Sequence, residues 1–145
     1  MSITIINSII SIALALNTSP VNVCSVISLE TAGTFSTTIR GPATKYGKAI
    51  GLIQFMPATA KELGTTTYKL SKMTFEQQSK YIIKYMKKRR FKAQHDGNDL
   101  KRMYSTIFCG NPNYKRCMRL NDGYNSYKNI LDKHSKAHII KCKNI

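Results

Sequence analysis

Acidic residues are scarce in this sequence of 145 residues. Seven Asp and Glu stand against 23 Lys and Arg, which gives a formal net charge of +16. The binding partner of the protein, or the surface on which it acts, is therefore expected to be polyanionic. Nucleic acid, an anionic membrane face and the bacterial cell wall all meet that condition. The hydrophobic share of 42% and the charged share of 21% exclude collagen-like and wholly disordered chains.

Cysteine pairs of the CxxC type are also absent. The four cysteines are Cys24, Cys109, Cys117 and Cys142, and neither they nor the histidines have metal-ligand spacing. We therefore expect no metal and no cofactor. Cys24 lies in an apolar stretch and is interpreted as a small core residue, whereas pairing of Cys109 with Cys117 is left open. Four cysteines in a chain of this length do not predict a disulfide scaffold.

No charged side chain precedes Glu30. Residues 3–16 are largely apolar, but they lack the basic start of a signal peptide and are shorter than the ~20 residues of a membrane span. They are interpreted as a first core helix, with no convincing signal peptide. Residues 61–145 contain 20 basic and six acidic residues, so they carry +14 of the net charge. We expect this part to bear the electrostatic face, with His134 and His138 at the surface of a basic tail.

Caps and apolar spacing predict a mostly α fold, in a single domain over residues 1–145. Five or six short helices are expected around a small irregular or β segment. The expected helices cover residues 5–16, 21–31, 57–63, 75–90, 99–109 and 124–138. Ser19 and Thr74 are predicted N-caps, and Gln77 is predicted to complete a capping box. Residues 33–50 are rich in threonine and glycine and predict the irregular segment.

Among the seven carboxylates, Glu30 has the setting that a general acid requires. It follows 29 uncharged residues and stands at the C-terminal end of an apolar helix, where the helix dipole disfavours a negative charge. Burial and the dipole should both raise its pKa, which keeps the carboxyl protonated near neutral pH. The alternative is a hydrogen-bonded surface residue just past a core helix. The other carboxylates are interpreted as solvated, capping or turn residues.

Two runs of residues near Glu30 form a recognisable pattern. Glu30-Thr31 ends a helix, and the run AIGLIQFMPATA follows at residues 49–60. These runs resemble the first two motifs of the SLT-type lytic transglycosylases of the lysozyme-like superfamily, in the branch found in bacteriophage tail and lysis proteins. Thr31 stands where that family has Ser. The third motif, Ala-Tyr-Asn-x-Gly, is degenerate at residues 106–110 and is imitated by residues 123–126.

The resemblance implies a set of residues that contact the substrate. They are Thr31, Gln54, Asn125 and a tyrosine, either Tyr104 or Tyr124, with Tyr124 preferred because Asn125 accompanies it. The amide of Gln54 can donate and accept, which suits an N-acetyl or hydroxyl group of a sugar. Its alternative role is that of a buried amide that stabilises the loop.

The implied reaction is cleavage of the β-1,4 bond between N-acetylmuramic acid and N-acetylglucosamine in peptidoglycan, with Glu30 as general acid and base. A hydrolase would need a second carboxylate about 5–10 Å away. None occurs between residues 31 and 61, which favours the transglycosylase route to 1,6-anhydro ends. A hydrolytic lysozyme that uses a distant Asp96 or Asp122 remains the alternative.

The partners implied are bacterial peptidoglycan, anionic cell-wall polymers and phage tail or virion proteins. The protein is expected in the phage virion or the host cell, acting in the periplasm or cell wall, as a monomer unless it is assembled into a virion. Two other classes of function are alternatives. One is a virion protein that binds the cell wall without activity, suggested by the altered third motif. The other is a basic nucleic-acid-binding protein, which leaves both motifs unexplained.

Overall fold

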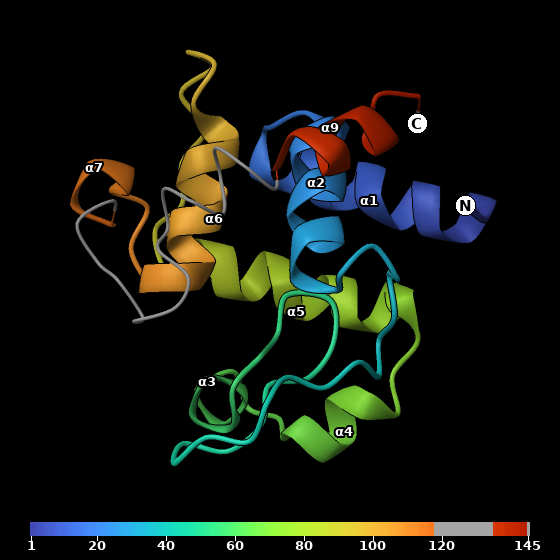
Figure 1. Ribbon diagram of the computed structural model, residues 1–145, viewed down its shortest axis with the longest axis vertical. Helices are drawn as coiled ribbons and strands as arrows, with labels where there is room; N and C mark the ends of the chain where they lie inside the picture. Colours follow the sequence, from blue (N-terminus) through green and yellow to red (C-terminus); the bar gives the residue numbers. More distant parts are fainter. Residues whose placement is uncertain (118–134, 145) are drawn as a thin grey trace.

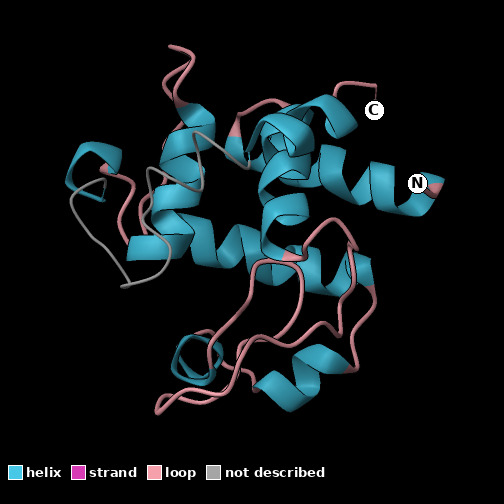
Figure 2. Ribbon diagram, viewed as in Figure 1, coloured by secondary structure: helices cyan, strands magenta, loops and turns pink. Residues whose placement is uncertain are grey.

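Helices dominate the part of the chain that the computed structural model describes, residues 1–117 and 135–144. They are α1 (Ile3–Leu16), α2 (Pro20–Glu30), α3 (Pro57–Glu62), α4 (Thr67–Ser71), α5 (Phe75–Lys88), α6 (Asp99–Cys109), α7 (Tyr114–Cys117) and α9 (Ser135–Cys142), as Figure 1 shows. The mostly α fold class is confirmed. In these residues the expected β segment is reduced to isolated bridges, which pair Arg40 with Ile50, Thr44 with Gly47, and Ile50 with Phe55 (Figure 2).

The predicted caps of α2 and α5 are confirmed. The Ser19 hydroxyl accepts a hydrogen bond from the backbone N–H of Asn22 at 3.2 Å, and Pro20 occupies the first turn. The Thr74 hydroxyl accepts from the N–H of Gln77 at 3.2 Å, while the Gln77 side chain accepts from the N–H of Thr74 at 2.9 Å. Each cap contributes about 1 kcal/mol. These local interactions set where the two helices begin.

The described residues form more helices than the five or six expected, because two short ones, α4 and α7, occur in addition. The residues of α3 were expected to be helical, whereas α4 and α7 were not. Four or five residues are too few to show a helical period, so sequence periodicity misses such elements. The described part of the last helix, α9, extends four residues beyond the predicted end at His138, and the start of that prediction lies outside the described residues.

The centre of the core is α2, which packs against α1, α6 and α9. Its buried residues lie on all sides of the helix: Val23, Cys24, Ser25, Val26, Ile27 and Ser28. In Figure 1, α5 crosses below α1 and α2, and the irregular segment with α3 and α4 lies beyond α5. The C-terminal end of α2 therefore points from the helical core toward the irregular segment.

Two disulfides join the described helices. Cys24 of α2 is bonded to Cys142 of α9, and Cys109 of α6 is bonded to Cys117 of α7. The pairing that the sequence left open is therefore formed. The interpretation of Cys24 as a small core residue is confirmed by its full burial, and the residue is in addition cross-linked. Its partner lies 118 residues away, and no local pattern reveals that two such residues meet.

Two more contacts hold α9 against α2 and the loop that follows it. The Ser28 hydroxyl lies 2.6 Å from Nδ1 of His138, and the Lys141 ammonium donates to the carbonyl of Gly33 at 2.7 Å. Lys141 also lies 5.1 Å from the ring centre of Phe35. His138 is half-buried, so its predicted place on the surface of a basic tail was wrong. His134 lies outside the described residues.

The apolar N-terminal region forms α1 and α2. No helix in residues 1–117 or 135–144 has by itself the length and apolar character of a membrane span. Taken together, α1 and α2 reach that length and composition, but they meet at a bend of 115°. The interpretation of residues 3–16 as a core helix is supported by the burial of one face of α1, whose buried residues are Ser8, Ile9, Ile12, Ala13 and Leu16.

Candidate active site

Glu30 is the last residue of α2, and its side chain is half-buried at the end of the core. Burial removes water from the carboxylate and raises the pKa of Glu30 from 4.5 to about 8. The raised pKa predicted from its position is therefore confirmed, with burial as the cause. The carboxyl is protonated at neutral pH, which is the state that a general acid needs.

The aromatic residue that interacts with Glu30 is Tyr85, on the buried face of α5. Its phenol donates a hydrogen bond to the backbone carbonyl of Thr106 at 2.7 Å, which ties α5 to α6. Burial raises the pKa of Tyr85, nearby Arg89 lowers it, and the charge of Glu30 raises it further. This electrostatic effect indicates that the Tyr85 phenol and the Glu30 carboxyl lie in the same region of the molecule.

Tyr85 is not among the predicted site residues, although a signal for it exists. It lies on the same face of α5 as Phe75, Ile82 and Met86, all buried. A polar group on an otherwise apolar helix face must find a hydrogen-bond partner inside the protein. Gln78 occupies the same face and carries the same signal.

A small cavity of about 60 Å³ opens beside Tyr85. Its lining comes from the second motif, the start of α3, α5 and α6: Ile53, Gln54, Phe55, Met56, Thr59, Tyr85 and Ile107. Ile107 belongs to the place predicted for the third motif. The fold thus brings the second and third predicted motifs to one cavity, next to the tyrosine that interacts with Glu30.

Gln54 lines this cavity but uses its amide to hold its own loop. It has a left-handed backbone with φ of 56°. Its side-chain nitrogen donates to the carbonyl of Gly51 at 3.0 Å and to that of Ile39 at 3.2 Å. Both N–H groups are therefore occupied, and only the carbonyl oxygen is left to accept from a ligand. The alternative role, stabilisation of the loop, is what the geometry supports.

The loop before Gln54 is built around a buried amide, Gln78. Its oxygen accepts from the N–H of Leu52 at 3.1 Å, and its nitrogen donates to the carbonyls of Thr37 and Leu70 at 2.8 and 2.7 Å. Gly51 has φ of +81°, and a Cβ on it would lie 2.5 Å from the Gln78 oxygen. Glycine is required there because this side chain approaches the backbone closely.

Thr31 supports the loop from the other side. Its hydroxyl donates to the carbonyl of Ile27 at 2.7 Å and accepts from the N–H of Phe35 at 3.0 Å. The side chain is fully buried. The predicted contact with substrate is therefore wrong, because no surface of Thr31 is exposed. The hydroxyl instead fixes the backbone that follows Glu30, because it joins Ile27 of α2 to Phe35 of the next loop.

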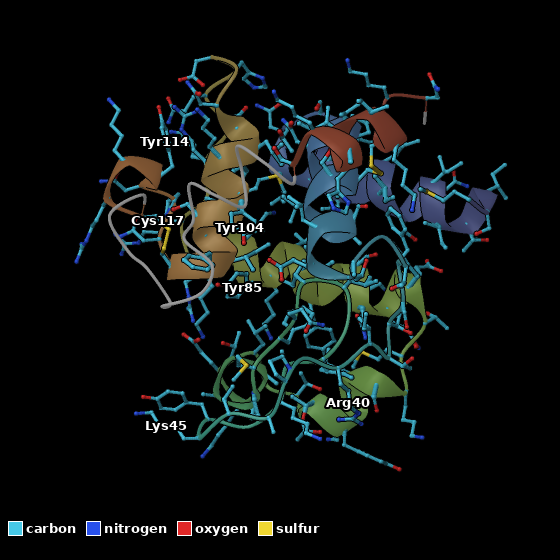
Figure 3. All side chains as sticks on the ribbon, in the orientation of Figure 1. Arg40, Lys45, Tyr85, Tyr104, Tyr114 and Cys117 are labelled. Carbon is cyan, nitrogen blue, oxygen red and sulfur yellow. A yellow bond between two sulfur atoms is a disulfide. The ribbon has the colours of Figure 1, made fainter. Side chains whose placement is uncertain are left out.

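Tyr104 lies on α6 next to the residue that precedes Glu30. It is buried against Leu29, and its ring stacks on Phe108 with 5.8 Å between centres. Figure 3 shows Tyr104 and Tyr85 in the same region of the molecule. Tyr104 therefore lies close to the C-terminal end of α2, while its contact with substrate stays a prediction. Tyr124 and Asn125 lie outside the described residues.

A second carboxylate, Glu62, also raises the pKa of Tyr85, and it is exposed, as its interpretation as a solvated residue expects. The Arg89 guanidinium stacks 5.1 Å from the ring centre of Tyr85 and binds both oxygens of Glu62, one at 2.8 Å. Lys88 contributes a further ion pair at 3.8 Å. The hydrogen bonds from Arg89 lower the pKa of Glu62. Glu62 is therefore ionised, and its charge is balanced by its neighbours.

Asp96 is the distant carboxylate of the hydrolase alternative. It lies just before the N-terminal end of α6. It binds Arg102 at 2.6 Å, and the same arginine binds Asp99 at 3.0 Å. Since an α-helix rises 1.5 Å per residue, Asp99 lies about 10 Å along α6 from Thr106, the partner of Tyr85. Asp96 is therefore paired with Arg102 near the start of α6, away from Thr106 along this helix. Asp122 lies outside the described residues.

No group of three or more His, Cys, Asp or Glu side chains within residues 1–117 and 135–144 could hold a metal ion. Comparison with known proteins gave no match: no family model fits the sequence, and neither a curated protein nor a solved structure is similar to it. The resemblance read from residues 30–31 and 49–60 therefore remains a prediction that rests on those residues.

Proposed function

We propose that the protein is a lytic transglycosylase that cleaves the β-1,4 bond between N-acetylmuramic acid and N-acetylglucosamine in peptidoglycan. The observation that carries the proposal is the burial of Glu30 at the end of α2, which raises its pKa to about 8. A carboxylic acid held neutral at neutral pH can donate its proton to a glycosidic oxygen. The motifs at residues 30–31 and 49–60 supply the substrate class.

In the proposed reaction, Glu30 serves twice. Its carboxyl gives a proton to the glycosidic oxygen as the bond from that oxygen to the sugar carbon breaks. The 2-acetamido group of the substrate stabilises the electron-poor carbon. Glu30, now ionised, takes the proton of the sugar's own 6-hydroxyl, whose oxygen bonds to that carbon. The product is a 1,6-anhydro end, and Glu30 is again protonated.

The other carboxylates support this route over hydrolysis. A retaining or inverting hydrolase needs a second carboxylate that can attack carbon or activate water. Glu62 interacts with Tyr85, but Arg89 and Lys88 occupy it. Asp96 is bound to Arg102 beyond the far end of α6. Neither carboxylate is arranged as a nucleophile or a base.

The net charge of +16 supports a role at the cell wall. Peptide stems and wall phosphates are anionic, so lysine and arginine side chains would concentrate the protein on its substrate. This attraction weakens as salt increases. We propose that the protein works in the host periplasm or cell wall, as part of a phage virion or of a lysis system.

The test is a digest of purified peptidoglycan by the wild-type protein and by Glu30→Gln, analysed by mass spectrometry. Muropeptides one water lighter than lysozyme products are expected from the wild type and none from the variant. Glu76→Gln is the matched control, because Glu76 is an exposed carboxyl of α5 that lines a different groove. It should leave the products unchanged.

Other products would refute parts of the proposal. Full-weight reducing ends would mean hydrolysis, and loss of those ends in Glu62→Gln would identify the second carboxylate. If neither protein released any product while the wild type still bound the wall, the enzyme proposal would fall in favour of a binding protein.

A further inference from the structure

Helix α1 is apolar on two opposite sides. One side is buried against α2 and α5 and contains Ile9, Ile12, Ala13 and Leu16. The other side contains Ile3, Ile10 and Leu14, which are 74%, 36% and 78% exposed, with exposed Asn7 between them. The spacing of these four residues, three or four apart, places them on one face of the helix. We call this exposed face the outer face of α1.

The outer face is unusual for a helix in contact with water. Such helices normally turn charged residues outward, yet no residue before Glu30 is charged. Apart from α1 and Met1 next to it, the exposed large hydrophobic residues of the described chain are scattered singly: Tyr46, Tyr68 and Ile140. Scattered residues need no explanation, whereas three exposed apolar side chains on one face of an uncharged helix indicate a partner.

Positive charge lies directly beside the outer face. A groove of about 430 Å³ separates α1 from α5, with Asn7 and Ser11 on one wall and Glu76 and Lys80 on the other. Lys80 begins a row of exposed residues on α5 that continues, at helical spacing, through Lys84 and Lys87, of which Lys84 donates to the carbonyl of Leu63 at 2.8 Å. Glu76 and Lys80 are the charged residues that line the groove, and the excess of positive charge comes from the exposed lysines further along α5.

We propose that the outer face of α1 binds the surface of an anionic phospholipid bilayer. Ile3, Ile10 and Leu14 would enter the boundary between headgroups and acyl chains, and the α5 lysines would meet lipid phosphates. The charge argues against a second copy as the partner, since two molecules of +16 repel each other. A helix of 14 residues also presents a face only about 21 Å long, which is small for a stable dimer.

This binding is separate from the proposed function. Glu30 ends α2, and α2 turns away from α1 at 115°. Its 11 residues place Glu30 about 15 Å along α2 from the junction with α1. A molecule held by its outer face would therefore keep the candidate active site at a distance from the lipid, free to reach a polymer above the bilayer.

The test is co-sedimentation of the full-length protein with vesicles, which contain no peptidoglycan. One set is an equal mixture of phosphatidylcholine and phosphatidylglycerol, and the other is phosphatidylcholine alone. The protein is expected to bind the mixed vesicles, more weakly at high salt. Leu14→Ser should weaken that binding about tenfold, the loss expected for one leucine that leaves an apolar environment. Lys80→Gln should weaken binding to the mixed vesicles only.

A matched control and a direct check on the partner complete the experiment. Tyr68→Ser removes a side chain that is 68% exposed on α4, beyond α5 from the outer face (Figure 1), and should bind as the wild type does. Absence of binding, or equal binding by Leu14→Ser, would overturn the proposal. If light scattering showed a dimer that Leu14→Ser converts to a monomer, the bilayer proposal would be overturned in favour of a second copy as the partner. Leu14 is exposed, so the variant should retain its unfolding temperature.

Discussion

Replacement of Glu30 by glutamine is expected to stabilise the protein at neutral pH while it abolishes peptidoglycan cleavage. Glutamine has the shape of glutamic acid but cannot ionise. In the wild type, burial raises the pKa of Glu30 from 4.5 to about 8, so the folded state holds a proton that the unfolded chain releases. The stability of the wild type therefore decreases between these two pH values. The variant does not undergo this loss.

The magnitude follows from the size of the pKa shift. At pH 7 the pH is about 2.5 units above the pKa of the carboxyl in the unfolded chain. Ionisation of the unfolded chain therefore lowers the free energy of unfolding of the wild type by about 3 kcal/mol. Because the side chain is half-buried and some water reaches it, we expect about half of this, ~1.5 kcal/mol. For a domain of this size, that corresponds to a melting temperature about 5 °C higher in the variant. Below about pH 4.5 both states are protonated, and the two proteins should melt together.

The measurement is thermal unfolding of both proteins by circular dichroism across this pH range, with Glu76→Gln as an exposed control that should show little change. The difference between Glu30→Gln and wild type should grow with pH and level off above about pH 8. A difference that does not depend on pH, or a variant that is less stable at neutral pH, would refute the assignment of Glu30 as a buried, protonated acid.

Three further predictions concern activity and the covalent frame. The rate of peptidoglycan cleavage should fall above about pH 8 as Glu30 ionises, and a rate that is flat through this range in a muropeptide-release assay would count against the acid role. Gly51→Ala should lower the free energy of unfolding by about 2–4 kcal/mol in denaturant unfolding, because its Cβ would meet Gln78. Gly97 has φ of +85° but no atom within 4 Å of an added Cβ, so Gly97→Ala should lower the stability clearly less. Equal losses of stability in the two variants would disprove the contact with Gln78. Cys142→Ser should lower stability by about 4 kcal/mol, because the lost bond joins residues 118 apart, and a reductant should then affect the variant less than the wild type.

Features that depend on neighbouring residues could be predicted from the sequence. The caps at Ser19 and Thr74 act over three residues, and the position of Glu30 follows from the uncharged run before it. Each of these signals lies in residues that are neighbours along the chain. The start of α5 and the raised pKa of Glu30 therefore agree with expectation.

Features that depend on distant contacts could not be predicted. Thr31 and Gln54 have the expected residue types, but their side chains are occupied by backbone groups: Thr31 bonds to Ile27 of α2 and to Phe35, and Gln54 bonds to a loop that Gln78 also binds. Gln78 lies 27 residues beyond Gly51 along the chain, on another helix. The bond between Cys24 and Cys142 likewise depends on how α9 returns to α2, which no spacing of cysteines shows.

The bond between α2 and α9 has a topological consequence. It closes residues 24–142 into one covalent ring, and the bond between α6 and α7 closes a small ring within it. A protease that cuts the large ring once, between α2 and α6, leaves a single molecule whose pieces separate only after reduction. The bond forms in oxidising surroundings and stays open in a reducing cytosol. A chain that leaves the cytosol would therefore change from a linear covalent topology to a ring-closed one when it reaches oxidising surroundings.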